Sequence, residues 1–246
     1  MNLKNTLMGM LLLVFLFNSE QTIAQKMKEK YTMYSTIQIE TVKGKEKEFE
    51  RAVKTHNEKY HKEGTHKAYL REFLTGPKAG TYAWISGPKM FSDFESRPGE
   101  GEHADDWTNN VDSYVKHYGT VEFWKRNEKL SFTAANSENN KMNEVWYIDV
   151  EKGAWEKFNA TLAKAVAVNA KIGTDSFHTY NTSFSGGDGR DIALVFPFGS
   201  WSDMDIEDTF MKDFEELHGE GSWKTFLDDW NSSTVKIVQT VSKLVE

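Results

Sequence analysis

The stretch GKEKEFERAVKTHNEKYHKEGTHKAYLREFLTGPKAGTYAWISGP, residues 44–88, has a second copy of its glycine, phenylalanine and proline positions 109 residues further along the chain. The matched pairs are Gly44 with Gly153, Phe49 with Phe158, Gly64 with Gly173, Gly80 with Gly189 and Pro88 with Pro197. A colinear series at one fixed offset indicates an internal repeat, and a repeat constrains the architecture more strongly than any local pattern does. The chain is therefore predicted to consist of two similar units.

The repeat continues beyond Pro88 with a slowly growing offset, which indicates small insertions in the second copy. The matched segments are 91–93 with 201–203, 99–101 (Gly-Glu-Gly) with 219–221, and 105–107 (Asp-Asp-Trp) with 228–230. Residues 134–141 are rich in Asn, Ser and Glu, a composition typical of linkers. We therefore predict a first unit at 25–133, a linker at 134–141 and a second unit at 142–246.

Hydrophobic periodicity predicts the same order of elements in both units. In the first unit it predicts strands at 33–41, 66–74, 81–86 and 118–126, a helix from about residue 49 to 60, and a helical region at 91–115. In the second unit it predicts strands at 144–150, 176–184, 191–196 and 234–241, a helix at 154–171, and helical segments at 201–217 and 222–230. Each unit thus has the order β-α-β-β-α-β.

That order is the ferredoxin-like arrangement, in which two helices cover one face of a four-stranded antiparallel sheet. With two such units, the chain resembles the dimeric α+β barrel superfamily, which includes antibiotic-biosynthesis-type monooxygenases, EthD-like and NIPSNAP-like proteins. Single-chain relatives with two fused units include chlorite dismutases and dye-decolorising peroxidases. The resemblance implies an α+β fold in which two tandem ferredoxin-like units pack sheet to sheet as a pseudo-twofold barrel. Because it rests on topology and size, it transfers the fold more safely than the function.

The composition excludes several classes of function. The chain has 246 residues, 39% of them apolar, and a net charge of −7 at pH 7 without any compensating basic cluster. Such a charge argues against nucleic acid as a partner. The absence of cysteine excludes disulfides, thiolate metal sites and cysteine nucleophiles.

The N-terminus has the layout of a cleaved secretory signal peptide. Lys4 precedes an apolar run from Leu7 to Phe17 that is too short to span a bilayer, and Ala24 stands before a plausible cleavage site. We therefore expect residues 1–24 to be a signal peptide, a mature chain without a transmembrane segment, and a periplasmic or extracellular location.

Strand alternation separates a helix-facing set of side chains from a barrel-facing set. The helix-facing positions are predicted to be the aliphatic ones, which include Ala83 and Ile85. The opposite faces of the strands would then line a ligand pocket, because aromatic walls with a few polar groups are typical of such pockets. The predicted ligand-binding residues are Gln38, Tyr82, Trp84, Trp124 and Tyr147. The alternative is a barrel filled by side chains.

Three residues are candidates for proton transfer, namely Glu40, Asp149 and His178. Glu40 and Asp149 occupy equivalent positions in the two units, and approximate twofold symmetry would pair them. His56 and His178 are candidate axial ligands if the chain binds haem, as its single-chain relatives imply. The five-residue spacing of His56, His61 and His66 does not place them on one helical face, so no metal site is predicted from spacing.

These observations lead to three hypotheses, and they leave open both catalysis and the choice between monomer and homodimer. The first is an exported protein that binds a small apolar or aromatic molecule between its sheets, with a cofactor-independent monooxygenase-type reaction as an extension. The second is a haem-binding protein of the same fold. The third is a non-catalytic interaction module with a filled barrel.

Overall fold

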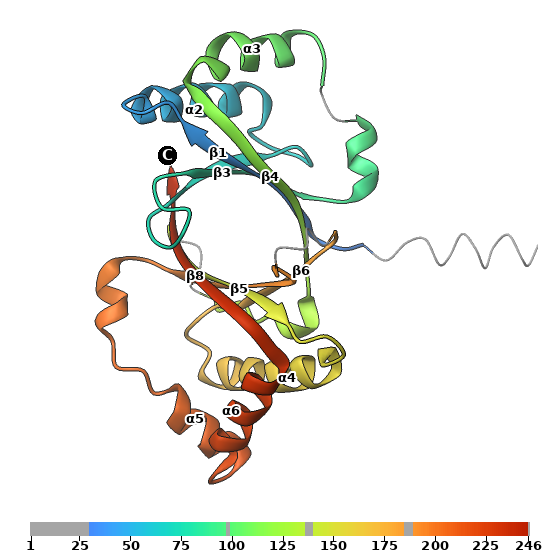
Figure 1. Cartoon of the computed structure of the whole chain (residues 1–246), viewed down its shortest axis with the longest axis vertical. Coiled ribbons are helices and arrows are strands. Elements are labelled where there is room, and N and C mark those ends of the chain that lie inside the picture. Colours follow the sequence, from blue (N-terminus) through green and yellow to red (C-terminus); the bar gives the residue numbers. More distant parts are fainter. Residues whose placement is uncertain (1–29, 97–98, 136–139, 185–188, 246) are drawn as a thin grey trace, which may run out of the picture. The chain divides into compact units, whose positions relative to one another are not determined.

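The computed structural model describes residues 30–96, 99–135, 140–184 and 189–245 (Figure 1). The first half contains β1 (Met33–Thr41), α2 (Glu46–Tyr60), β2 (Ala68–Phe73), β3 (Tyr82–Lys89), η1 (Phe91–Ser96), α3 (Glu102–Asn110), η2 (Asp112–Tyr114), β4 (Val115–Arg126) and η3 (Glu128–Leu130). The second half contains β5 (Met142–Val150), α4 (Trp155–Ile172), β6 (His178–Thr182), β7 (Ile192–Phe198), η5 (Trp201–Asp205), α5 (Phe210–His218), α6 (Ser222–Ser233) and β8 (Thr234–Val245). The predicted α+β class is confirmed.

Every strand is antiparallel to its neighbours. The first half has the strand order β4-β1-β3-β2 and the second half has the corresponding order β8-β5-β7-β6. The halves join edge to edge, because β2 pairs with β8 and β4 pairs with β6. The eight strands therefore close into one hydrogen-bonded ring around a shared interior, which leaves no free sheet edge.

Helices cover the outer face of each half, as Figure 1 shows for α2 and α3 in one half and for α4 in the other. The apolar stripe of α2 places Phe49 and Val53 against Ile39, Tyr82 and Trp84 of the sheet, all of them buried. In the second half, the residues that form the equivalent core are Ile148, Phe158, Leu162, Ile192 and Leu194. Each helix thus buries one face against its own sheet.

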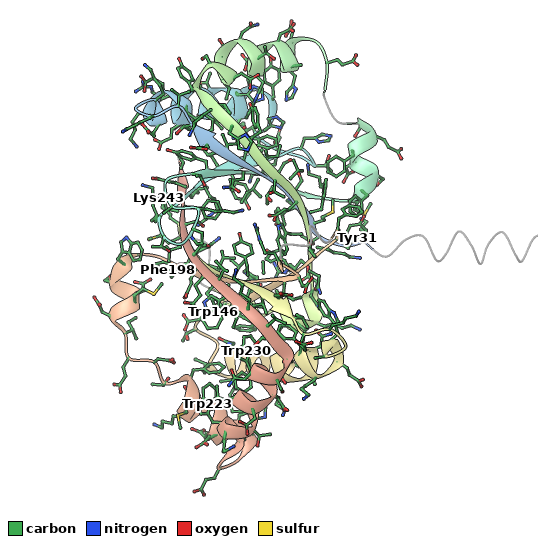
Figure 2. All side chains as sticks on the ribbon, viewed as in Figure 1. Tyr31, Trp146, Phe198, Trp223, Trp230 and Lys243 are labelled. Atoms are coloured by element: carbon green, nitrogen blue, oxygen red, sulfur yellow. The ribbon has the colours of Figure 1, made fainter. Side chains whose placement is uncertain are left out.

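The second half carries an additional helical layer. Phe214 of α5 and Phe226 of α6 pack against Ala165 and Val168 of α4. Figure 2 shows Trp223 and Trp230 within this layer, outside the ring of strands. The stacked side chains of α6 therefore lie on the outer, helix-covered side and not in the barrel interior.

Some predictions fall on segments outside the described residues. The predicted signal peptide lies wholly outside the described residues, and so do residues 136–139 of the predicted linker. In the described part of the chain, no helix combines the length and the apolar character needed to cross a membrane. Residues Thr32–Glu246 form one compact unit by their contacts.

Candidate functional site

A cavity of about 120 Å³ lies inside the ring of strands, and every one of the eight strands contributes to its wall. A single water molecule needs about 10–15 Å³, so the cavity has room for a small organic molecule. Its lining residues are Tyr34, Thr36, Gln38, Tyr69, Arg71, Phe73, Lys78, Ala83, Ile85, Glu122, Trp124, Asn143, Val145, Tyr147, Tyr180, Arg190, Ala193, Val195 and Ser242. The barrel is therefore not completely filled by its own side chains.

One side of the cavity is organised around the carboxylate of Glu122. Nη2 of Arg190 lies 2.7 Å from Oε2 of Glu122, and Nε1 of Trp124 donates to the same oxygen at 3.3 Å. The Arg190 guanidinium also stacks over the Tyr147 ring, 4.2 Å from its centroid. Both charged side chains are only 14% exposed, so their attraction is weakly screened by solvent. The pair gives this wall a fixed, polar surface beside two aromatic rings.

The opposite side contains Arg71, a buried cation that is not paired with a carboxylate in any contact of the described structure. Its Nε donates to Oγ of Ser242 at 3.0 Å, and its Nη2 donates to the carbonyl oxygens of Ser242 and Lys141, each at 3.0 Å. Burial lowers the pKa of Arg71 to about 10, which still leaves the guanidinium charged at neutral pH. Arg71 thus contributes a full positive charge to the wall at the β2–β8 seam.

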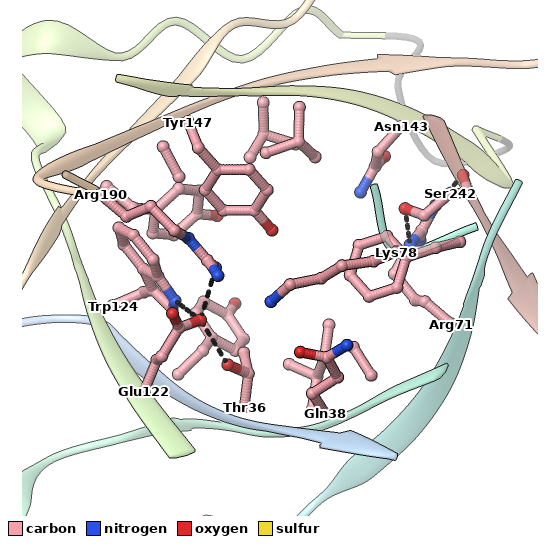
Figure 3. A pocket seen from close by; sticks show the side chains of 18 of the residues that line it. Thr36, Gln38, Arg71, Lys78, Glu122, Trp124, Asn143, Tyr147, Arg190 and Ser242 are labelled. Carbon is pink, nitrogen blue, oxygen red and sulfur yellow. Dashed lines mark hydrogen bonds and ion pairs between the residues drawn. The ribbon is translucent and has the colours of Figure 1, made fainter. Parts of the chain in front are cut away.

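Lys78 extends into the cavity from the turn between β2 and β3. Figure 3 shows its ammonium group near the middle of the space, between the phenol of Tyr147 and the amide of Gln38. Among the lining residues there are three cationic groups, Arg71, Lys78 and Arg190, against the single carboxylate of Glu122. The difference of two positive charges gives the cavity a potential that favours an anion.

Tyrosines form much of the remaining wall, and they stay protonated. Burial raises the pKa of Tyr147 to about 12 and that of Tyr69 to about 12. Burial likewise raises the pKa of Tyr34 and of Tyr180 above the ordinary value. At neutral pH these phenols can donate a hydrogen bond to a ligand, but they do not add negative charge.

The structure brings three of the predicted ligand-binding residues, Gln38, Trp124 and Tyr147, to the cavity wall. For β3 the predicted orientation was wrong. Tyr82 and Trp84 face α2 on the outer side, where Tyr82 donates to Glu50 at 2.9 Å and Trp84 donates to Asn57 at 3.0 Å.

The physical reason for the error is that both faces of β3 are apolar, so alternation alone cannot tell them apart. Tyr82 and Trp84 fill the wide space under α2 and satisfy their polar atoms on the helix. Ala83 and Ile85 face the cavity instead, opposite Gln38 and Thr36 respectively in the β1–β3 register.

The predicted pairing of Glu40 with Asp149 is absent from the described contacts. Glu40 is exposed and forms an ion pair with Lys116 at 2.6 Å. Asp149 lies near Asp191 instead. Burial and the nearby charge of Asp191 raise the pKa of Asp149. Neither carboxylate lines the cavity.

The two candidate haem ligands lie in different surroundings. His56 lies in α2, outside the ring of strands, and is only 1% exposed. His178 on β6 lies opposite Val195 of β7, a residue of the cavity wall. Nδ1 of His178 is buried and makes no hydrogen bond to the described residues. His178 itself does not line the cavity.

Arg71, Lys78 and Arg190 are residues of the site that were not predicted from the sequence. Arg71 lies between Tyr69 and Phe73 on one face of its strand, which is a usable signal, since a charged residue on an otherwise aromatic face is seldom buried without hydrogen-bond partners. Lys78 lies in a turn and Arg190 in the loop before β7, where the sequence does not indicate which way a side chain points.

The buried imidazole of His178 is expected to make the protein less stable at acid pH. Burial and the charge of Arg126 lower the pKa of His178 from 6.5 to about 4. Between those values the unfolded chain binds a proton that the folded chain does not, so stability is complete above pH 6.5 and decreases as the pH falls towards 4.

Urea unfolding at pH 7 and pH 4.5 checks this expectation. The wild type should lose about 2 kcal/mol more between the two pH values than His178→Gln. His117→Gln, at an exposed position on β4, serves as the control and should behave like the wild type. Equal losses in the wild type and His178→Gln would contradict the prediction.

Comparison with known proteins identifies relatives of the fold only. No protein-family model matches the chain, and no curated protein matches it in sequence. A "putative monooxygenase" from Lactobacillus acidophilus matches with a TM-score of 0.57 at 11% identity, covering 88% of this chain and 95% of that one. A mutant chlorite dismutase from Candidatus Nitrospira defluvii matches with a TM-score of 0.53 at 10% identity, covering 89% and 92%.

A heme-binding protein from Thermus thermophilus matches with a TM-score of 0.52 at 6% identity, covering 88% of this chain and 92% of its own. The chain has their α+β fold. At these identities the likeness extends to nearly the whole chain but carries no function, because one fold hosts many activities.

Proposed function

We propose that the barrel binds a small aromatic molecule that carries a negative charge, such as an aromatic carboxylate or phenolate. The observation that supports this function is the combination of tyrosine and tryptophan walls with three cations against one carboxylate. Aromatic walls bind a flat ring through apolar contact, and Lys78 and Arg71 complement an anionic group attached to it. The open cavity argues against the alternative of a filled barrel.

The test compares 2-naphthoate with 2-naphthalenemethanol, a neutral molecule with the same ring system, by isothermal titration. We expect saturable 1:1 binding of naphthoate, with the neutral compound at least about tenfold weaker, because a charge-assisted hydrogen bond contributes about 1.5–3 kcal/mol. Lys78→Met should weaken the affinity for naphthoate about tenfold and leave the affinity for the neutral alcohol unchanged. Ala83→Phe, which fills the cavity, should weaken both.

Equal affinity for the two compounds would contradict the anionic preference. Unchanged affinity in Ala83→Phe would contradict binding in the cavity. Val42→Ala provides a control, because Val42 is exposed outside the cavity and its replacement should change neither affinity.

A cofactor-independent oxygenation of the bound molecule would extend this function, and the likeness to a protein described as a monooxygenase supports it. In such a reaction a methylene of an acidic aromatic substrate and O₂ give a ketone and water, so both hydrogens of the methylene leave in the water. Glu122 is the carboxylate within the cavity and would accept the first proton, in place of Glu40, Asp149 or His178. Oxygen uptake by the wild type but not by Glu122→Gln would support this extension.

Haem binding is the second candidate, supported by the chlorite dismutase and heme-binding neighbours. His56 does not fit an axial role, because the rings of Tyr60, His61, His103 and Trp107 enclose it with centroids 4.9–5.2 Å away. His178 fits better, since its buried Nδ1 has no hydrogen bond in the described structure. Haem would supply oxygen and electron-transfer chemistry. A saturable Soret band that His178→Ala removes would support this candidate, and a flat hemin titration would exclude it.

We also propose that the chain consists of two tandem units, because of its sequence repeat and its strand order. The equal strand orders of the two halves support tandem ferredoxin-like units, 25–133 and 142–246, related by an approximate twofold axis through the barrel. Export through residues 1–24 is also proposed, on the layout of that segment. N-terminal sequencing of protein recovered from the producing cells tests it, with a mature terminus near Gln25 as the expected result.

A further inference from the structure

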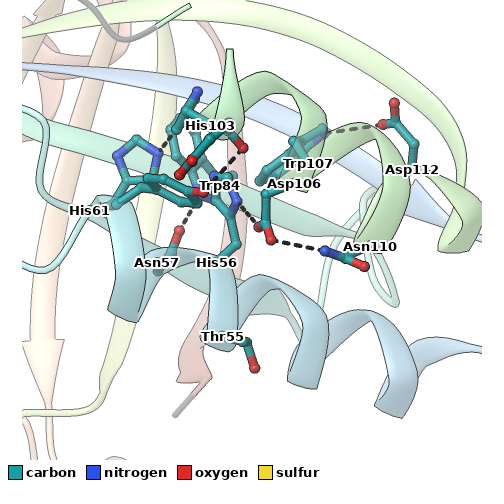
Figure 4. Close-up of polar contacts among 12 residues, drawn as sticks. Thr55, His56, Asn57, His61, Trp84, His103, Asp106, Trp107, Asn110 and Asp112 are labelled. Atoms are coloured by element: carbon teal, nitrogen blue, oxygen red, sulfur yellow. Dashed lines mark hydrogen bonds and ion pairs between the residues drawn. The ribbon is translucent and has the colours of Figure 1, made fainter. Parts of the chain in front are cut away.

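Three histidines that are far apart in sequence meet on the outer side of the first sheet. His56 lies in α2, His61 follows its last turn, and His103 lies in the first turn of α3 (Figure 4). One ring nitrogen of each lies within 4.8 Å of one ring nitrogen of both others. His56 and His61 are 1% and 5% exposed, and His103 is partly exposed. The group is thus a buried cluster with one side near solvent.

The orientation of His56 is fixed by a carboxylate. Its Nδ1 lies 2.7 Å from Oδ2 of Asp106, and Asp106 also accepts a hydrogen bond from Asn110 at 2.8 Å. The oxygens of a carboxylate accept at both contacts, so Nδ1 of His56 is the donor to Asp106. In the neutral imidazole the proton therefore sits on Nδ1, and Nε2 carries the lone pair. That nitrogen is buried and makes no hydrogen bond to any described residue.

A backbone carbonyl fixes His61 in the same way. Its Nδ1 lies 2.7 Å from the carbonyl oxygen of His66, which can only accept, so Nδ1 donates and Nε2 is directed away from it. Nε2 of His61 lies 2.9 Å from Nε2 of His103. Two histidines are thus held with Nδ1 engaged by oxygen acceptors, which leaves Nε2 of each as the nitrogen that can bind a metal ion.

This arrangement is that of a metal site in which the histidines bind the ion and oxygen acceptors, here Asp106 and the carbonyl of His66, orient their rings. Metal-binding histidines commonly donate their other ring N–H to a carboxylate or a backbone carbonyl, which orients the ring. A tetrahedral zinc ion with Zn–N bonds of about 2.0–2.1 Å sets its nitrogen ligands about 3.3 Å apart. The nitrogens here, at 2.9 Å and within 4.8 Å, need only small side-chain movements to reach that spacing.

We propose that His56, His61 and His103 bind a divalent transition-metal ion of the zinc class, with Asp106 as a positioning residue. Three imidazole ligands suit zinc and leave one position of the tetrahedron for water. The ion also accounts for the buried Nε2 of His56, since a buried acceptor without a partner destabilises the folded chain. Spacing within α2 could not indicate the site, because the third ligand comes from α3.

The proposed metal site is separate from the cavity. Trp84 contacts the cluster from the sheet, with its ring centroid 5.1 Å from that of His61, and Trp84 points away from the barrel interior. The sheet therefore lies between the two sites. Binding at one can be measured while the other is empty, and failure of either proposal leaves the other standing.

The experiment uses untagged, chelator-treated protein titrated with zinc chloride by calorimetry. We expect one equivalent to bind with a dissociation constant below about 1 μM, and His61→Ala and His103→Ala to weaken binding at least about 100-fold. Asp106→Asn keeps the three ligands but loses the anionic acceptor, so it should weaken binding about 10–100-fold. His117→Ala removes an exposed histidine of the same half and should bind like the wild type.

Far-ultraviolet circular dichroism checks the fold of each variant before titration. His103 is only partly buried, so His103→Ala is the variant most able to keep the fold, and Asp106→Asn provides a second one. The absence of saturable one-equivalent binding would overturn the proposal. Wild-type affinity in a folded His103→Ala, or an equal loss of affinity in His117→Ala, would overturn it as well.

Discussion

Arg71→Met is expected to lower the free energy of unfolding by about 3–5 kcal/mol, because it leaves buried oxygen acceptors without their charged donor. Arg71 is 8% exposed and donates two hydrogen bonds across the β2–β8 seam to Ser242 and a third to the carbonyl oxygen of Lys141. Methionine fills a similar volume but donates none of them. The buried Oγ of Ser242 and its carbonyl oxygen then lose a charged donor, and hydrogen bonds to charged groups contribute about 1.5–3 kcal/mol each.

A matched control lies on the same seam. Lys243 of β8 pairs with Glu72 of β2 at 2.9 Å, but its side chain is 44% exposed. Lys243→Met removes a cation from the same pair of strands and should cost less than about 1 kcal/mol, because solvent-exposed ion pairs contribute little. Urea unfolding of the two variants measures the difference. Equal, small losses would show that the buried hydrogen bonds of Arg71 do not hold the seam.

Arg71→Met should also weaken the binding of the proposed anionic ligand, because it removes one of the three cations of the cavity wall. A variant that unfolds at room temperature would prevent that measurement. Arg71→Lys keeps the charge while it loses the planar fork that reaches both partners. It should therefore recover more of the naphthoate affinity than of the stability.

Trp84→Ala is expected to cost about 3–5 kcal/mol of stability and to leave naphthoate affinity within about twofold of the wild type. Trp84 is 8% exposed and packs with Phe49, Val53 and Tyr82 under α2, so truncation opens a space in the core and not in the barrel. It also removes the hydrogen bond from its indole to Asn57. The two measurements together distinguish a core residue from a ligand-binding one.

Ile85→Ala, one position along the same strand, is the matched control. Ile85 lines the cavity, so its truncation should change naphthoate affinity more than Trp84→Ala does, and cost less stability. Loss of naphthoate binding in a stable Trp84→Ala variant would instead place Trp84 at the ligand and contradict the observed orientation of β3. Trp84→Phe should recover most of the lost stability, because the phenyl ring refills much of the space.

Much of the fold was predictable because the repeat and the periodicities are local properties of the chain. Strand β1 was predicted at the observed bounds, Met33–Thr41, because Ile37 and Ile39 alternate with polar residues. The site was harder to predict, and the successes again follow local contrast. Gln38 was placed on the cavity wall because its strand has one polar face, whereas β3 has two apolar faces and its side chains were assigned to the wrong sides.

The sequence by itself determined that the chain is α+β, and its internal repeat predicted the order of strands and helices in each half. These features depend on spacing along the chain, which a single sequence records completely. Only the tertiary structure decided that Arg71, Lys78 and Arg190 surround one cavity, and that His103 of α3 joins His56 and His61. The physical reason is that ring closure and helix packing bring together residues from separate elements, and the packing of large side chains such as Trp84 decides which way each strand faces.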